Sequence, residues 1–333
     1  MPGSYEVPPA PQWSKVIATT LRLWLRRRVL RVPDGPDGDR LVVRRALAGV
    51  LPVVIVAAAV VGVTLASQPT AGGRHPALTP HLGEASLAAA ERNRNLAALW
   101  IAAQVSRGVI VACDPLMCAA LRRDGLPAGG LEVLGTGAGD PLGSGVVVST
   151  TAVRSELGPR LTSVYAPTVL ASFGSGPSGV AVRVTAPEGA AAYLSAAHAD
   201  LLARVQDGEQ LLRNGNVHLL PAGQADLAAG TVDSRLLLTL AALAHSVPVY
   251  VRQFSGVGPG ASAGTPMRSM TISGAVVLPH NASYTGVVLA FLRAQRAPFL
   301  ATATTAGTGA ATVLQIGFSA PSPLGLLTAQ VPS

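Results

Sequence analysis

The chain has 333 residues, of which 49% are hydrophobic, 13% charged and only 4% aromatic, so it can bury a sizeable core built mainly from aliphatic side chains. The formal net charge is +8, but residues 1–45 alone hold nine basic and four acidic side chains, and the remainder of the chain is close to neutral. A nucleic-acid-binding domain usually has a basic stripe on its folded surface, so this distribution excludes nucleic acid from the expected partners.

The first predicted element is a basic amphipathic helix over residues 13–32. Its apolar positions recur at helical spacing, and basic side chains crowd the positions between them. Such a helix is suited to lie on the inner leaflet of a bilayer that contains anionic lipids. Two alternatives are a tail that only fixes the membrane topology and a docking site for a cytoplasmic protein, which would make the chain a transmembrane adaptor. The expected membrane-interface residues of this helix are Trp13, Trp24, Arg26, Arg27 and Arg28.

Residues 46–67 form an uncharged, predominantly apolar stretch that is long enough to cross a bilayer as one helix. Arg44 and Arg45 stand directly before this stretch, whereas the first charged residue after it is Arg74. The asymmetry predicts a single-pass membrane protein with a cytoplasmic N-terminus and a C-terminal region outside the cytoplasm. A cleaved signal peptide is the alternative, although its leader and its apolar core are usually shorter.

Residues 68–85 contain three prolines and no apolar periodicity, so they are expected to form a stalk. A long helix is predicted over residues 86–106, because apolar residues recur there at helical spacing. The expected buried face of this helix consists of Leu87, Leu96, Leu99, Trp100 and Ala103.

The rest of the chain alternates strand-like apolar runs with helices, which predicts an α/β fold in two subdomains. The first, residues 86–188, has strands near 108–114, 131–134, 145–151 and 168–186 and helices near 115–125 and 152–158. The second, residues 189–333, has helices near 190–212, 234–244 and 284–296 and strands near 216–220, 247–254, 267–272 and 312–319. Continuous Val and Ile runs favour a largely parallel sheet that is covered on both faces.

Cys113 and Cys118 are the only cysteines, and they flank a predicted turn from strand to helix. A disulfide persists on the outer side of a membrane, and a bridge between these residues would fix the start of the helix. Two free buried thiols are the alternative. The spacing does not match the C-x-x-C of a redox pair, and no histidine lies nearby in the sequence to complete a metal site.

Motifs typical of enzymes and cofactor sites are missing or lack the required context. Residues 260–264 fit G-x-S-x-G, but a nucleophile elbow needs a strand directly before it and a helix directly after it, so a flexible loop is expected. The region after the predicted span has no lysine, which excludes a P-loop lysine and Schiff-base chemistry there. We therefore expect no cofactor, no metal site and no catalytic residue that the sequence can identify.

Short motifs spread through the first subdomain are Asp114, Asp140-Pro141, Val146–Thr150, Arg154, Phe173-Gly174 and Arg183. With these motifs, residues 93–185 resemble the soluble extracytoplasmic module of actinobacterial mannosyltransferase-type membrane glycosyltransferases. The resemblance implies an α/β accessory module of the cell envelope. This chain has one predicted span and lacks the multi-span catalytic part of that family, so no catalytic residue is carried over. Its 24 arginines against one lysine also indicate a genome rich in G and C, as in actinobacteria.

We expect a membrane-anchored, non-enzymatic envelope protein whose outer domain binds a partner protein or a cell-wall glycan. The candidate ligand cleft consists of Asp114, Asp140, Arg154 and Tyr165. One alternative is a hydrolase or transferase on peptidoglycan or polysaccharide, which would need Asp114 and Asp140 in one cleft about 5–10 Å apart. An Asp114 that serves only as a helix cap would instead favour binding. A glycan surface usually has exposed aromatic side chains, whereas most of those in the outer region are expected in the core.

Overall fold

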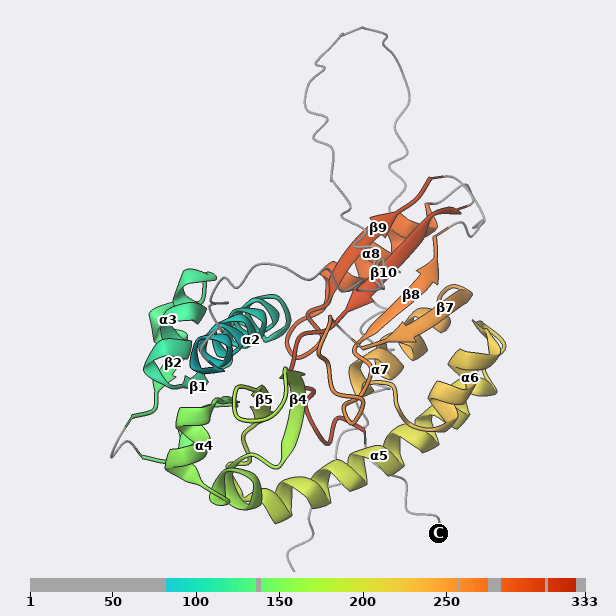
Figure 1. Ribbon diagram of the computed structural model, residues 1–333. Helices are drawn as coiled ribbons and strands as arrows, with labels where there is room; N and C mark the ends of the chain where they lie inside the picture. Colours follow the sequence, from blue (N-terminus) through green and yellow to red (C-terminus); the bar gives the residue numbers. More distant parts are fainter. Residues whose placement is uncertain (1–81, 136–138, 257, 275–282, 309–310, 328–333) are drawn as a thin grey trace, which may run out of the picture. The chain divides into compact units, whose positions relative to one another are not determined.

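The structure is a computed structural model that describes residues 82–327 apart from 136–138, 257, 275–282 and 309–310 (Figure 1). The described residues form a mixed α/β fold with two five-stranded sheets. The predicted amphipathic helix and membrane span, residues 13–32 and 46–67, lie outside the described residues. In the described part of the chain, no helix is both long and apolar enough to cross a membrane.

The first sheet has the strand order β2-β1-β3-β5-β4. In this sheet β1 (Val111–Cys113) pairs in parallel with β2 (Leu131–Val133) on one side and with the central strand β3 (Val146–Ser149) on the other. A hairpin of β4 (Thr168–Phe173) and β5 (Val180–Val184) extends the sheet by antiparallel pairing of β5 with β3. Every residue of β1 and β3 is buried, which explains their continuous runs of small and β-branched apolar residues.

Three helices pack around this sheet. α2 (Leu82–Gln104) contacts β4, β5 and the next helix, α3 (Pro115–Arg123), which follows β1. α4 (Thr151–Leu157) follows β3 and begins at a cap made by the Thr150 hydroxyl. Shorter helical turns at η1 (Ala128–Gly130), η2 (Pro141–Gly143) and η3 (Leu161–Tyr165) complete the connections.

The second sheet has the strand order β6-β7-β8-β10-β9. β6 and β7 are parallel, and all other neighbouring strands are antiparallel. α5 precedes this sheet and contacts α6 and α7 as well as η3 of the first half (Figure 1). The strands are β6 (Val217–Leu219), β7 (Val249–Ser255), β8 (Ser269–Ser273), β9 (Thr302–Ala306) and β10 (Val313–Gly317). The helices are α5 (Ala190–Leu212), α6 (Pro221–Ala228), α7 (Ser234–Ala244) and α8 (Tyr284–Arg293).

The predicted bounds of α5 and α7 are confirmed, but the prediction of a largely parallel sheet is wrong. Each sheet ends in an antiparallel hairpin, β5-β4 in the first and β10-β9 in the second. The sequence did not predict α6 or β9. α6 is one short helix with Gly223 inside it, and the residues of β9 are mostly exposed, so neither has the apolar periodicity that identifies an element.

The predicted buried face of the first long helix is largely wrong. α2 begins at Leu82, so residues 82–85 are helical rather than part of a stalk. Trp100 is buried as expected, but Leu87, Leu96 and Leu99 are 73%, 44% and 58% exposed, and Ala103 is exposed as well. The buried face consists instead of Asn93, Ala97, Ala98, Trp100 and Ile101.

Close packing explains why small residues of α2 face the sheet. The Asn93 side-chain amide donates to Ser178 O at 3.0 Å, in the turn between β4 and β5. A Cβ atom at Gly174 in the same turn would overlap the Asn93 amide, so this side chain lies directly against the turn. Such close packing favours a small side chain at Ala97, one helical turn further along α2, although the larger Trp100 and Ile101 are also buried.

Backbone pairings join the two halves. Ser172 N donates to Gly260 O and Ser262 N donates to Leu170 O, both at 2.8 Å, so the segment after β7 lies along the outer edge of β4. Residues 260–264, which match G-x-S-x-G, form a loop, and hydrogen bonds hold its residues Gly260 and Ser262 at a sheet edge. Covering β4 in this way also protects an edge that would otherwise be open to another strand.

Candidate functional site

Asp114 is a helix cap at the carboxyl edge of the first sheet. Its Oδ1 accepts hydrogen bonds from Leu116 N at 2.9 Å and from Met117 N at 3.1 Å, in the first turn of α3. Its Oδ2 accepts a hydrogen bond from the Thr150 hydroxyl at 2.5 Å. The side chain is buried, and both oxygens are used to join the starts of α3 and α4.

Asp140 lies away from Asp114. It precedes β3 and caps η2, accepting a hydrogen bond from Leu142 N at 3.1 Å. Asp114 follows β1. Because β1 and β3 are parallel, Asp114 lies after the carboxyl end of its strand and Asp140 lies before the amino end of the neighbouring strand. The carboxylate that interacts with Asp140 is Glu132: burial raises the pKa of Glu132, and the negative charge of Asp140 raises it further.

The other two residues of the predicted cleft also have separate structural roles. The Arg154 guanidinium donates to Ser149 O and Gly179 O, each at 2.8 Å, and ties α4 to the turn between β4 and β5. Tyr165 is buried in a small apolar cluster, with the Arg160 guanidinium 5.0 Å from its ring centre. The structure therefore does not bring the four predicted residues together in one cleft.

The disulfide prediction is confirmed. Cys113 and Cys118 are bridged, with their Cα atoms 5.4 Å apart, and both are buried in the core of the first half. The bridge joins the last residue of β1 to the first turn of α3. Its two cysteines therefore flank the Asp114 cap in the sequence. Among the described residues, no group of histidine, cysteine and carboxylate side chains could hold a metal ion.

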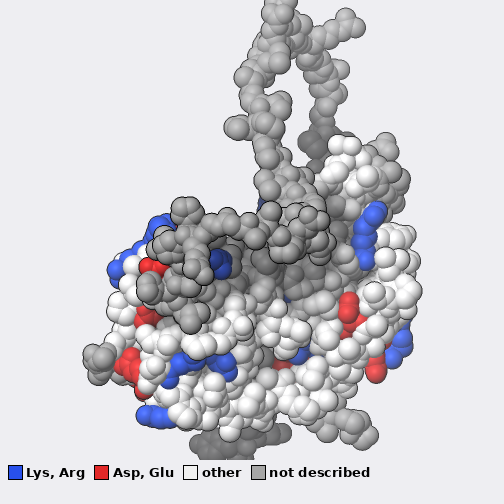
Figure 2. All heavy atoms as spheres, in the orientation of Figure 1, with Lys and Arg blue, Asp and Glu red and all other residues white. Residues whose placement is uncertain are grey.

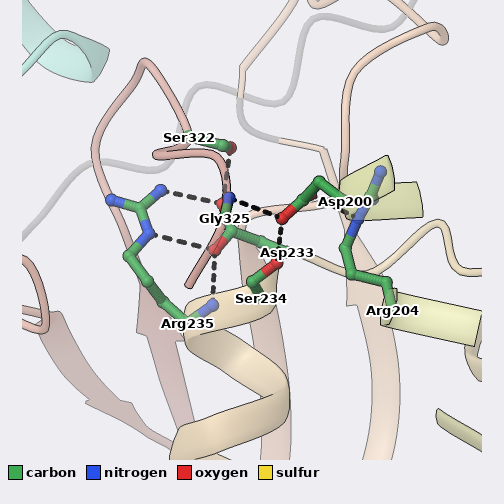
Figure 3. Close-up of polar contacts among 7 residues, drawn as sticks. All are labelled: Asp200, Arg204, Asp233, Ser234, Arg235, Ser322 and Gly325. Carbon is green, nitrogen blue, oxygen red and sulfur yellow. Dashed lines mark hydrogen bonds and ion pairs between the residues drawn. The ribbon is translucent and has the colours of Figure 1, made fainter. Parts of the chain in front are cut away.

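A larger polar cluster lies between α5, α7 and the segment that follows β10 (Figure 3). Asp233 accepts hydrogen bonds at Oδ1 from Arg235 N (2.8 Å) and Nε (3.0 Å), and at Oδ2 from an Arg235 terminal nitrogen (2.8 Å) and the Ser322 hydroxyl (2.5 Å). Burial alone would raise the pKa of Asp233, but the hydrogen bonds and charge of Arg235, together with Ser322, hold it below its ordinary value of 3.8. The pair is buried, and it caps the start of α7.

A second carboxylate, Asp200 of α5, lies beside the first (Figure 3). Its Oδ1 accepts hydrogen bonds from the Ser234 hydroxyl and from Gly325 N, each at 3.2 Å. Its Oδ2 lies 2.9 Å from Nε of Arg204, one helical turn further along α5. The two carboxylates therefore fasten residues 319–325 to both helices, since Arg235 also donates to Ser319 O at 3.0 Å.

A third buried arginine adds positive charge near this cluster. Arg268 directly precedes β8, and its guanidinium lies 5.8 Å from the ring centre of Trp100. One of its terminal nitrogens has no hydrogen-bond partner in the described part of the chain. Burial lowers the pKa of Arg268 to about 10, with the charge of Asp233 raising it and that of Arg235 lowering it.

A cavity of about 340 Å³ adjoins the cluster. It is lined by residues of β4, β5 and α5, by the segment 263–266, and by Ser322 and Leu324 after β10. Its walls are mainly apolar, and Arg204 is the buried charged side chain among them. Burial raises the pKa of Tyr193 on the same wall and the charge of Asp200 adds to this, whereas a hydrogen bond with Thr168 opposes it.

Sequence patterns do not predict this cluster, because its members are separated by up to 125 positions in the chain. Two local features could have pointed to it. Asp200 and Arg204 form an i,i+4 pair on α5, and Arg235 interrupts an otherwise apolar stretch in α7. A charge at a buried helical position is uncommon without a partner, so Arg235 required a carboxylate nearby.

Comparison with known proteins gives no match, because no protein family, no curated protein and no solved structure is significantly similar to the chain. The resemblance of residues 93–185 to an envelope module therefore stays a prediction from short motifs.

Proposed function

We propose that the chain is a membrane-anchored, non-enzymatic cell-envelope protein whose α/β region lies outside the cytoplasm and binds a partner protein. The anchor is residues 46–67, with Arg44 and Arg45 on its cytoplasmic side. The basic helix over residues 13–32 would lie on the anionic inner leaflet. A buried disulfide supports the outer location, because disulfides form and persist in oxidising compartments.

The carboxylates favour binding over catalysis. The enzymatic alternative, an envelope hydrolase or transferase, would use Asp114 and Asp140 as an acid and a base in one cleft. Asp114 has both oxygens engaged in capping and bridging helix starts, and Asp140 lies at the opposite edge of the sheet. Asp114 and Asp140 therefore do not form a pair of free carboxylates that could act together on a glycosidic or a peptide bond.

The exposed apolar surface favours a protein over a glycan, and this is the observation that carries the proposal. Three side chains on the solvent side of α2, namely Leu96, Leu99 and Ala103, form what we call the α2 outer face. Their spacing of three and four positions aligns them along one stripe of the helix, as in helix-mediated protein contacts.

Aromatic side chains are placed unfavourably for a glycan. Trp100, Tyr165 and Tyr284 are buried, and Tyr250 is the tyrosine with substantial exposure in the described residues, stacked on the His218 ring at 4.3 Å. Charged side chains of both signs are present on the face drawn in Figure 2, beside wide uncharged areas. The α2 outer face presents exposed leucines, so recognition by it would depend on apolar contact.

The membrane topology can be tested with reporters fused to the C-terminus. A reporter that is active only outside the cytoplasm should be active, and one that is active only inside should be silent. The full-length chain should also stay with the membrane during extraction at alkaline pH. A soluble, shortened form in the medium would show that residues 46–67 are a cleaved signal peptide and would contradict the anchor.

The partner surface can be tested by photo-crosslinking in intact cells. A photoreactive amino acid at Leu99 should give one discrete protein adduct, and Leu96→Asp on the same stripe should abolish it, because a charge there opposes apolar contact. Leu202 of α5 is the matched control, since its exposed fraction of 54% is close to the 58% of Leu99. Equal adducts from both positions, or none from Leu99, would contradict the proposed surface.

A further inference from the structure

The cavity beside Arg204 has the size and the walls of a small-molecule site. Its volume of about 340 Å³ is at the lower end of the range that ligand pockets usually occupy, ~300–1,000 Å³. Leu170 and Val184 of the first sheet and Leu201 of α5 line it. Leu194, which is 51% exposed, also lines it, so the cavity reaches the surface at that point. A polymer chain or a large head group would not fit this space.

Arg204 brings a buried guanidinium to this cavity. The residue is only 7% exposed and lines the wall. Its Nε lies 2.9 Å from Asp200 Oδ2 but, although buried, forms no hydrogen bond within the described residues. A buried guanidinium that is not fully hydrogen-bonded is costly, so a bound acceptor at this position would be favoured.

The hydroxyl groups on the same walls already have partners. Thr265 donates to Ser262 O at 2.9 Å, and Thr231 donates to Asp226 O at 3.0 Å. Ser322 donates to the buried carboxylate of Asp233. Among the described residues that line the cavity, Arg204 is therefore the buried charged side chain that could meet a ligand.

We propose that this cavity binds a small monocarboxylate with an apolar body, the carboxylate on the guanidinium of Arg204. A planar guanidinium matches the two oxygens of a carboxylate, and the apolar walls would take up the remainder of the molecule. One arginine that is already in an ion pair with Asp200 suits a single negative charge better than a doubly charged phosphate. This ligand is independent of a protein partner on the α2 outer face.

The surrounding hydrogen bonds hold Arg204 in place before any ligand binds. Asp200 is fixed by the Ser234 hydroxyl and by Gly325 N, and it in turn fixes the Nε side of Arg204 (Figure 3). Little conformational freedom is then lost when a ligand binds, which favours affinity.

The proposal can be tested by calorimetric titration of the full-length protein in lipid nanodiscs, with empty nanodiscs as the blank. The probe is 4-phenylbutyrate, and 4-phenylbutanol is its uncharged counterpart. We expect saturable binding of the acid at one site and at least about tenfold weaker binding of the alcohol, because a charge-assisted hydrogen bond is lost. Arg204→Gln should weaken binding of the acid by about 10- to 100-fold and leave the alcohol unaffected.

Two further variants make the result decisive. Ala197→Phe fills the cavity without removing a charge, so it should abolish binding while the melting temperature is retained. Arg213→Gln removes an exposed arginine at the end of the same helix and should change nothing. If Arg204→Gln does not fold, Ala197→Phe decides the question. Absence of saturable binding to the wild type, equal affinity for the acid and the alcohol, or retained binding in Ala197→Phe would each overturn the proposal.

Discussion

Asp233→Asn is expected to lower the free energy of unfolding by about 3–5 kcal/mol, the usual cost of removing one partner of a buried ion pair. The substitution keeps the size of the side chain and a carbonyl oxygen that can still cap α7. It removes the charge that balances Arg235, which is buried and receives no other carboxylate within the described residues. It also weakens the contact of Ser322 and so loosens residues 319–325. Urea denaturation of the purified full-length protein, followed by circular dichroism, measures the change.

Asp140→Asn is the matched control, because Asp140 also caps a helical turn but is exposed and forms no ion pair in the described structure. Its expected cost is at most about 1 kcal/mol, typical of a weakened cap. Adding Arg235→Met to Asp233→Asn should recover part of the loss, since the buried charge is then removed as well. Equal costs for Asp233→Asn and Asp140→Asn would show that the buried pair adds nothing beyond a cap.

The same residue predicts a dependence on pH. The pKa of Asp233 is lower in the folded protein than its ordinary value, so the folded state favours the ionised form. Its contribution to stability is complete above the pKa of the unfolded chain and is lost as the pH falls through the folded pKa. The difference in stability between wild type and Asp233→Asn should therefore narrow as the pH is lowered below about 4. A constant difference over that range would exclude the ionised carboxylate as its cause.

The sequence predicted those helices and strands whose bounds are set by neighbouring residues, such as a cap or an apolar run. α7 has a capping aspartate and a continuous apolar run, and its bounds follow from these features. β9 is different, because its threonines and alanines are mostly exposed and its place is set by pairing with β10. The prediction of the buried face of α2 was wrong for a related reason. Which side of the helix packs depends on contacts such as that of Asn93 with the turn at Gly174, and these are not contained in the spacing of the leucines.

The candidate sites also differ in whether their residues are close together in the sequence. The Cys113–Cys118 bridge joins neighbours five positions apart, and the turn between them could be predicted from the sequence. The cluster around Asp233 depends on Ser322, 89 positions away, and on how the chain returns after β10. Asp200 and Arg235 have ion-pair partners close in the sequence, but the hydrogen bonds that join the two pairs to one another and to residues 319–325 form only in the folded chain. Such a cluster can be suspected from a charge at an apolar position, but its members cannot be named.

Replacing Cys113 and Cys118 together by alanine is expected to lower the free energy of unfolding by about 2–5 kcal/mol, the usual range for a native disulfide. Closing so short a loop accounts for about 2 kcal/mol of this on the chain-entropy estimate. The rest reflects packing, because both residues belong to the core beneath α2 and α3. Mass spectrometry without reductant should find the two cysteines in one linked peptide, and thermal unfolding should show a lower Tm for the variant. Free alkylation of both thiols in the unfolded, unreduced protein would contradict the bridge.

The disulfide also connects stability to the proposed location. Wild-type protein made in a reducing cytoplasm should unfold at a lower temperature than protein exported to an oxidising compartment, because the bridge forms only in the second. The Cys113→Ala, Cys118→Ala variant is the control, and its Tm should be the same from both compartments. Since both sulfur atoms are buried, reductant added to the folded, exported protein should act only as fast as the first half opens. If wild-type protein from the two compartments has the same Tm, the bridge does not stabilise the fold, and it gives no support to a place outside the cytoplasm.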